Sequence, residues 1–171
     1  MKTYSRILSV SLLIGLCMFL MACPVSTSYP LGKKDVEKID KNLLGTWKND
    51  ITDSEVIKAT VKKADEYTYD IVVDEKGSMF MAENTNFKGW LTKIEDKTFL
   101  VLQEVGEDGK TKIIFYVYHV NIEKNKLTTH DITLKVGGTD SVTSIEAYRD
   151  EVKASMAKEG FLAGKIVWAK K

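Results

Sequence analysis

The sequence predicts a mainly β fold: an eight-stranded antiparallel up-and-down barrel followed by one helix and a final strand. From Leu43 onward, short runs of alternating apolar and polar residues follow one another, as is typical of half-buried strands. Turn segments such as DEKG and GEDGK separate these runs, so successive strands are expected to run antiparallel. After residue 136 the spacing of the apolar residues changes to that of a helix.

The eight barrel strands are predicted from runs of even spacing. The alternation is clearest in SEVIKATVKKAD, where polar residues separate Ile57, Ala59 and Val61. A meander of this kind can close on itself, and closure removes the sheet edges that promote aggregation. The runs cover residues 43–50, 54–65, 67–74, 78–83, 87–94, 98–105, 111–123 and 126–136.

A helix is predicted within GGTDSVTSIEAYRDEVKASMAKEGF. Apolar residues recur there every three or four positions between Ile145 and Met156. Thr143 and Glu146 have the spacing of a capping box at the start of the helix, and Gly160 is expected just past its end. The following segment FLAGKIVWAK is predicted to form the final strand.

The first 22 residues have the organisation of a signal peptide. MKTYSR contributes the positive charges of Lys2 and Arg6, and an apolar run over residues 7–22 follows it. This run is shorter than the about 20 residues that a membrane-spanning helix needs. The sequence therefore predicts export and removal of this segment.

The apolar run ends with the sequence LMAC, which resembles the lipobox of bacterial lipoproteins. Met21 departs from the small or β-branched residue that is usual at its position. The resemblance implies cleavage between Ala22 and Cys23, after a diacylglycerol has been attached to the Cys23 sulfur. Cys17 would leave with the leader, so the mature chain would contain no disulfide. An ordinary signal peptide followed by a cysteine without a role is the alternative.

The lipobox resemblance also implies a partner and a location. Two or more acyl chains on Cys23 would anchor the protein stably to the lipid bilayer of the cell envelope, whereas one would bind only marginally. Both the inner and the outer membrane remain open as its location. We divide the chain into a lipoprotein signal peptide (1–22), a lipidated N-terminus and spacer (23–42) and the barrel domain (43–171).

The first strand carries the motif Gly45-Thr46-Trp47. With the order of the strands, the helix and the final strand, this motif resembles the lipocalins. The resemblance implies a cavity for a small apolar molecule, a glycine that permits the turn into the strand, and a tryptophan that plugs the closed end of the barrel. The arginine that usually covers this tryptophan is absent from the final strand, which offers Lys165, while Arg149 lies in the predicted helix. A core aromatic residue in a β-sandwich is the alternative for Trp47.

Composition and motifs exclude several functions. Of 25 basic residues two lie in the leader, which leaves 23 against 24 acidic residues, so the mature chain lacks the basic surplus of nucleic-acid-binding proteins. The sequence contains no Gly-x-Ser-x-Gly motif, no phosphate-binding glycine loop and no His-Glu-x-x-His motif. We therefore expect a protein that is not an enzyme and that needs no cofactor.

The two histidines are candidates for binding a ligand. A turn at Lys124-Asn125 in the hairpin VYHVNIEKNKLTTHDI would place His119 opposite His130. Phe115 and Val117 share their strand face, so we expect the four residues in the barrel interior, facing a ligand. A metal site would need at least a third protein ligand, and Asp131 points to the other face. Two histidines that are hydrogen-bonded within a core or rim are the favoured alternative to a metal site.

Two functions remain from the sequence. The first is a lipid-anchored protein that binds or carries a small apolar ligand inside its barrel. The second is a non-enzymatic scaffold or accessory lipoprotein with a filled barrel, whose outer surface binds another, unknown protein of the envelope. An eight-stranded barrel can be filled by its own side chains or hold one small ligand, so the packing of the interior distinguishes the two.

Overall fold

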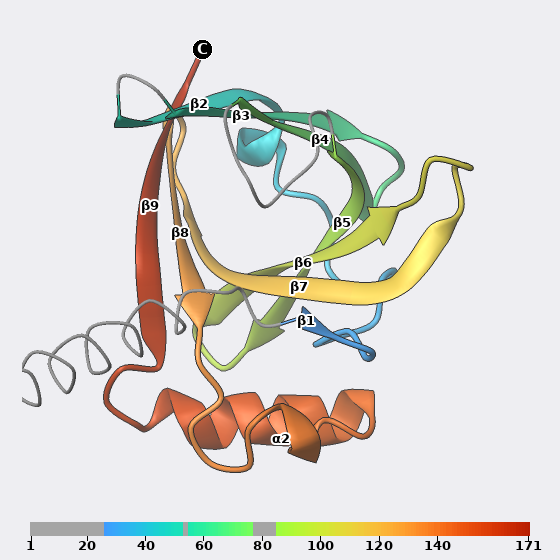
Figure 1. Ribbon diagram of the computed structural model, residues 1–171, viewed down its shortest axis with the longest axis vertical. Helices are drawn as coiled ribbons and strands as arrows, with labels where there is room; N and C mark the ends of the chain where they lie inside the picture. The colour runs from blue at the N-terminus through green and yellow to red at the C-terminus, as the bar shows by residue number, and fades with distance from the viewer. Residues whose placement is uncertain (1–25, 53–54, 77–84) are drawn as a thin grey trace, which may run out of the picture.

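The structure is a computed structural model, and it describes residues 26–52, 55–76 and 85–171. Most of the described residues belong to strands, as the alternating pattern predicts (Figure 1). The elements within these ranges are β1 (Ser26–Thr27), η2 (Lys41–Leu43), β2 (Gly45–Thr52), β3 (Glu55–Lys63), β4 (Thr68–Lys76), β5 (Thr85–Ile94), β6 (Lys97–Val105), β7 (Thr111–Ile122), β8 (Lys126–Ile132), η3 (Thr139–Ser141), α2 (Ile145–Met156) and β9 (Leu162–Lys170).

The strands from β2 to β9 form a closed antiparallel barrel of eight strands, which confirms the predicted fold class (Figure 1). Each strand pairs with the next, and β9 closes the ring because it pairs with both β8 and β2. The final strand is therefore one of the eight barrel strands and no addition to them. The run 78–83, which was predicted as a barrel strand, lies outside the described residues.

Apolar side chains pack on both sides of the barrel wall. The interior cluster consists of Leu43, Trp47, Val61, Tyr69, Ile71, Phe87, Leu91, Leu100, Leu102, Val120 and Leu127. The outer cluster, which lies between the barrel and α2, consists of Leu31, Trp90, Ile94, Phe99, Val101, Phe115, Val117, Ile132, Tyr148, Val152 and Phe161. The run FLVL at residues 99–102 is buried throughout because β6 contributes alternately to both clusters.

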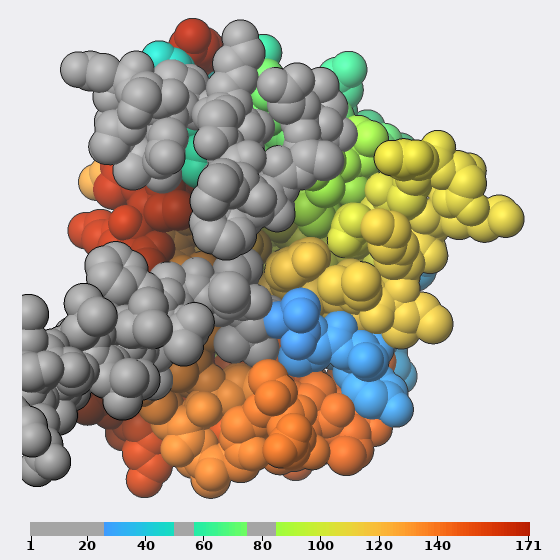
Figure 2. All heavy atoms as spheres, in the orientation of Figure 1, coloured from blue at the N-terminus to red at the C-terminus, as the bar shows by residue number. Residues whose placement is uncertain are grey.

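The segment that precedes the barrel is part of the folded domain. β1 pairs with β7 at Tyr116 and Phe115, and Leu31 is fully buried in the outer cluster. Trp90 Nε1 donates a hydrogen bond of 2.9 Å to the carbonyl oxygen of Gly32. Figure 2 shows the first part of this segment in blue, between the yellow atoms of β7 and the orange atoms of the segment around η3 and α2. Residues 26–42, which the sequence analysis assigns to a spacer, thus pack against the barrel.

Arg149 on α2 joins the N-terminal segment to the barrel. Its Nη1 donates hydrogen bonds to the Leu31 carbonyl oxygen at 3.3 Å and to Thr92 Oγ1 at 3.2 Å. Its Nη2 donates to the Lys93 carbonyl oxygen at 2.8 Å. One guanidinium therefore joins three segments, a geometry that its rigid set of donors permits.

The ends of α2 differ slightly from the prediction. Ser144, not Thr143, is the N-cap, because its side chain accepts a hydrogen bond of 3.0 Å from Ala147 N. The helix ends at Met156, and Gly160, which has a φ of 71°, lies in the turn that follows. In the described part of the chain no helix is long and apolar enough to cross a membrane.

The loop that leads from β8 to α2 is held by a buried carboxylate. Glu151 is only 6% exposed, and it accepts hydrogen bonds from Val136 N at 3.0 Å and Gly137 N at 2.8 Å. Ser155 Oγ donates a third at 2.9 Å. Burial would raise the pKa of the Glu151 carboxyl, but the hydrogen bonds together lower it below the ordinary value.

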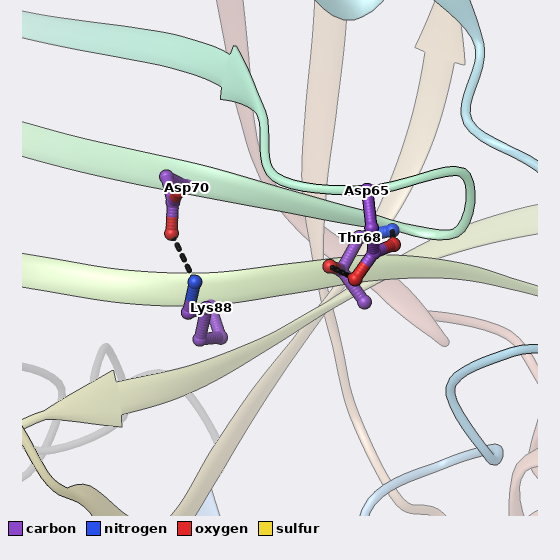
Figure 3. A network of polar contacts seen from close by, with 4 residues as sticks. All are labelled: Asp65, Thr68, Asp70 and Lys88. Atoms are coloured by element: carbon purple, nitrogen blue, oxygen red, sulfur yellow. Dashed lines mark hydrogen bonds and ion pairs between the residues drawn. The ribbon is translucent and has the colours of Figure 1, made fainter.

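Polar contacts on the outside of the barrel fix the β3–β4 hairpin and its neighbour β5 (Figure 3). The carboxylate of Asp65 in the turn accepts hydrogen bonds from Thr68 Oγ1 at 2.6 Å and from Thr68 N at 2.7 Å. Lys88 on β5 forms an ion pair with Asp70 on β4, directly across the strand pair. Thr68 is buried, whereas Asp65, Asp70 and Lys88 are at least partly exposed, and we assign these contacts to the architecture and not to a site.

Candidate functional site

One end of the barrel is closed around Trp47, as the Gly45-Thr46-Trp47 motif implies. The Trp47 side chain is fully buried in the interior cluster, and its Nε1 donates a hydrogen bond of 2.8 Å to the Leu43 carbonyl oxygen. Leu43 ends the short helix η2, which lies at this end of the ring of strands (Figure 1). Gly45 has a φ of 127°, a backbone conformation that few residues other than glycine adopt.

Lys170 covers Trp47 where the resemblance implies an arginine. Its Nζ lies 5.0 Å from the centre of the Trp47 ring and donates a hydrogen bond of 2.8 Å to the Asn42 carbonyl oxygen. Lys165, which the final strand was expected to offer in place of the arginine, instead lines a groove beside His130. The assignment of Lys170 depends on the pairing of Trp47 with Lys170 between β2 and β9, which no local pattern in the sequence reveals.

Tyr69 completes the closed end. Its hydroxyl accepts a hydrogen bond of 2.7 Å from Asp40 N and donates one of 3.2 Å to the Asp40 carbonyl oxygen. Burial raises the pKa of this hydroxyl far above its ordinary value, so Tyr69 is neutral. With Trp47 and Leu43, it forms a dry floor, because all three side chains are fully buried.

Other apolar side chains that face the interior keep partial exposure. Val73, Tyr116 and Tyr118 pack against the interior cluster without being buried by it. Tyr116 meets Phe87 edge to face, with the ring centres 6.1 Å apart. Trp168 also faces inward, and its Nε1 donates a hydrogen bond of 3.0 Å to Thr129 Oγ1. The interior thus combines a sealed floor with apolar walls that are only partly covered.

The predicted pairing of His119 with His130 is confirmed. Glu123 N donates a hydrogen bond of 2.9 Å to the Lys126 carbonyl oxygen, which fixes the turn, and the two histidines are cross-strand partners. Their ring centres lie 5.6 Å apart.

The expected position of the histidines in the barrel interior is wrong. Phe115 and Val117, on the same face of β7 as His119, belong to the outer cluster beneath α2. Tyr116, Tyr118 and Val120 face the interior instead. Both faces of β7 carry apolar residues, so only the packing of α2 decides which face is the outer one. Phe115 and Val117 are consequently buried under the helix and cannot contact a ligand in the barrel.

The histidine pair lies beside an open groove on the outer surface. The groove has a volume of about 430 Å³ and is mostly polar, and its lining is Asp96, Thr98, His119, Val120, Asn121, Lys126, Thr128, His130 and Lys165. The Nδ1 atoms of both histidines are buried and have no hydrogen-bond partner within the described residues.

Both imidazoles in this groove are neutral at neutral pH. Burial lowers the pKa of His119, and the charges of His130 and Lys97 lower it further. Burial and the charge of Lys165 lower the pKa of His130. Within the ranges 26–52, 55–76 and 85–171, no three His, Cys, Asp or Glu residues come together as metal ligands. Two imidazoles alone do not make a stable zinc site. Because both Nδ1 atoms lack a partner within the described residues, the structure shows no hydrogen bond at these atoms for the alternative interpretation either.

Ala22 and Cys23, the predicted cleavage and lipidation residues, lie outside the described residues. Comparison with known proteins gives no match for this chain, whether with a family model, a curated protein or a solved structure. The molecular class that the fold defines is therefore an eight-stranded antiparallel barrel, with a closed end and one helix packed against its wall.

Proposed function

We propose that the chain is the precursor of a lipid-anchored protein of the bacterial envelope, whose lipocalin-like barrel binds or carries a small apolar ligand. The packing of the interior carries this proposal. A barrel that serves only as a scaffold would bury its inward-facing apolar side chains completely, whereas Val73, Tyr116 and Tyr118 keep partial exposure. Covering about 200 Å² of apolar surface would contribute roughly 5 kcal/mol before the cost of association.

The N-terminal segment supports the membrane part of the proposal. Ser26, the first described residue, pairs with Tyr116 on β7. Cys23 precedes it by three residues in the sequence, a span of at most about 10 Å. Acyl chains on Cys23 would thus hold the barrel directly at the bilayer, where apolar molecules partition. A long flexible spacer would instead allow the domain to lie at a distance from the membrane.

The accessory-scaffold function has its own supporting observation. Several large apolar side chains are exposed on the outer surface, among them Ile113 at 74% and Val136 at 57%. Scattered exposed apolar residues are common, whereas a contiguous patch would mark a protein interface. We rank this function second because these residues come from different elements, β7 and the loop after β8.

Two neighbouring positions on β4 give a matched test. Val73 faces the interior, whereas Val72 faces outward, since side chains alternate along a strand. We expect Val73→Trp to fill the interior and to lower affinity for the neutral fluorescent probe N-phenyl-1-naphthylamine about tenfold or more. Val72→Trp should leave the affinity unchanged. Equal binding by both variants and the parent protein would show that the probe does not enter the barrel and would reject the proposal.

The anchor is tested separately by mass. Protein from its native envelope should have the denatured mass of residues 23–171 plus acyl chains, and Cys23→Ser should abolish the added mass. An unmodified mass would remove the lipoprotein part of the proposal and leave ligand binding untouched. A native mass that exceeds the denatured one by a discrete amount would reveal a bound molecule directly.

A further inference from the structure

We infer that Asp131 is an anchor inside the barrel for a positively charged head group, and that the ligand is an amphiphile with an apolar body and an ammonium-type end. This inference rests on the proposed function, since it requires the interior to hold a ligand. It goes beyond that function by naming the class of ligand and a residue that selects it.

Asp131 faces the interior, unlike its neighbour His130. It is the cross-strand partner of Tyr118, whose side chain packs against the interior cluster. His130 is the partner of His119, which faces outward beside Phe99. Because alternate residues of a strand point to opposite faces, the carboxylate of Asp131 and the imidazole of His130 lie on different sides of the wall.

The backbone of β9 makes room for this carboxylate. The pairing of β8 with β9 shifts register between Thr129 and Asp131, which is a local irregularity of the ladder. Gly164 on β9 has a φ of 50°, and a Cβ atom built there would lie 2.0 Å from Asp131 Oδ2. Any other residue at position 164 would therefore clash with the carboxylate. Such irregularities commonly direct a side chain at a site.

The carboxylate is half-buried and lacks a compensating partner. No donor or cation in the described part of the chain forms a hydrogen bond or an ion pair with Asp131. Burial raises the pKa of its carboxyl; a protonated His130 would oppose this effect, but that imidazole is neutral at pH 7. Glu104, which lies near Tyr116, is by contrast paired with Lys112. Neither carboxylate oxygen is among the fully buried atoms that lack a partner in the described part of the chain, so the group is open to solvent or to a ligand, and a bound cation would offset the cost of its partial desolvation.

The chemistry of the surroundings defines the ligand. The side chains that face inward on the neighbouring strands are largely apolar, among them Tyr118 on β7 and Trp168 on β9. An apolar body would contact these walls, while a charged head would form a charge-assisted hydrogen bond with the carboxylate. An amphiphile of the same chain length with an anionic head group would be repelled by the Asp131 carboxylate, and its head group would have no hydrogen-bond donor to offer.

Three probes of equal chain length test the inference: dodecylamine, dodecanol and dodecanoate. Each is titrated at pH 7 against the mature chain, residues 23–171 with Cys23→Ser, by displacement of N-phenyl-1-naphthylamine. This chain contains every described residue and both apolar clusters. We expect dodecylamine to bind about tenfold more tightly than dodecanol, and dodecanoate to bind most weakly.

Asp131→Asn keeps the size of the side chain and removes its charge. It should abolish the preference for dodecylamine and leave the affinity for dodecanol unchanged. Asp140→Asn is the control, because Asp140 lies in the exposed helix η3 and its replacement changes the net charge equally. The thermal midpoint of Asp131→Asn should equal or exceed that of the parent, which shows that any lost affinity is not lost folding.

The outcomes separate the two proposals. Equal binding of the amine and the alcohol, or a preference for the amine that survives Asp131→Asn, would overturn the anchor and leave the barrel as an unselective apolar site. Failure of all three probes and of the fluorescent probe to bind the parent protein would overturn both the proposed function and the anchor.

Discussion

Leu31→Ala provides the strongest test of the packing of the N-terminal segment. The side chain is fully buried in the outer cluster, with Tyr148 and Val152 of α2 among its members. The backbone on either side is also held, because the Leu31 and Gly32 carbonyl oxygens accept hydrogen bonds from Arg149 and Trp90. The site therefore cannot collapse freely around the truncated side chain.

The magnitude follows from the atoms that are removed. Leu31→Ala removes three carbon atoms, and at about 0.8 kcal/mol each their transfer accounts for roughly 2.4 kcal/mol. The cavity left in a site that relaxes little adds about 1 kcal/mol or more. We therefore expect a loss of about 3 to 4 kcal/mol in the free energy of unfolding.

Urea unfolding, followed by tryptophan fluorescence and far-ultraviolet circular dichroism, measures this loss. Val36→Ala is the matched control, since Val36 belongs to the same segment and is 66% exposed; we expect a change within about 0.5 kcal/mol. A loss below about 1 kcal/mol for Leu31→Ala would refute the reasoning and restore residues 26–42 as a free spacer. A smaller m-value for the variant would instead indicate that the segment unfolds separately from the barrel.

Three further predictions concern the closed end, the buried carboxylate and the histidine groove. Lys170→Met should lower stability by about 1 kcal/mol, because it removes the cation over the Trp47 ring and one hydrogen bond; urea unfolding measures this loss, and an unchanged midpoint would contradict it. Glu151→Gln should cost about 2 kcal/mol at pH 7, since an amide cannot accept all three hydrogen bonds. Because the pKa of Glu151 is lowered in the fold, this carboxylate stabilises the fold above the ordinary carboxyl pKa, and the stabilisation is lost as the pH falls through the folded value. The free energies of unfolding at pH 7 and at pH 3 should therefore differ less for Glu151→Gln than for the parent protein. The pKa values of His119 and His130 are also lowered, so the unfolded chain takes up protons first and stability should fall as the pH drops through about 6.5. Replacement of both histidines by Gln should flatten this dependence, and a parent protein with constant stability between pH 7.5 and pH 5 would contradict it.

The histidine pair illustrates how far sequence reasoning reaches into a candidate site. The pairing of His119 with His130 follows from a turn four residues away, so a local pattern was enough to predict it. Whether the two histidines face the interior or the outside of the barrel depends on the contact of α2 with Phe115 and Val117. These two residues precede the helix by about 30 positions in the sequence. Since Tyr116, Tyr118 and Val120 make the other face equally apolar, hydrophobicity alone could not make the choice.

The residues that close and line the barrel show the same division. The family resemblance that Gly45-Thr46-Trp47 carries implied a plug at Trp47, and this motif can be found within one strand of the sequence. Lys170 was missed because it meets Trp47 only through the closure of β9 onto β2. The sequence placed Asp131 on the face opposite His130, which with the histidines expected inside meant the outer face; the structure reverses the two faces, and a register shift lies beside Gly164 next to Asp131.

The sequence by itself determined the class of fold. Period-two alternation, turn segments and the change to helical spacing are local, and each depends on residues that are close along the chain. Only the tertiary structure decided which strand closes the barrel, which face of β7 is inside, and that Leu31 belongs to the core. These features depend on contacts between distant segments, where several apolar surfaces compete and the free energy of packing selects one arrangement.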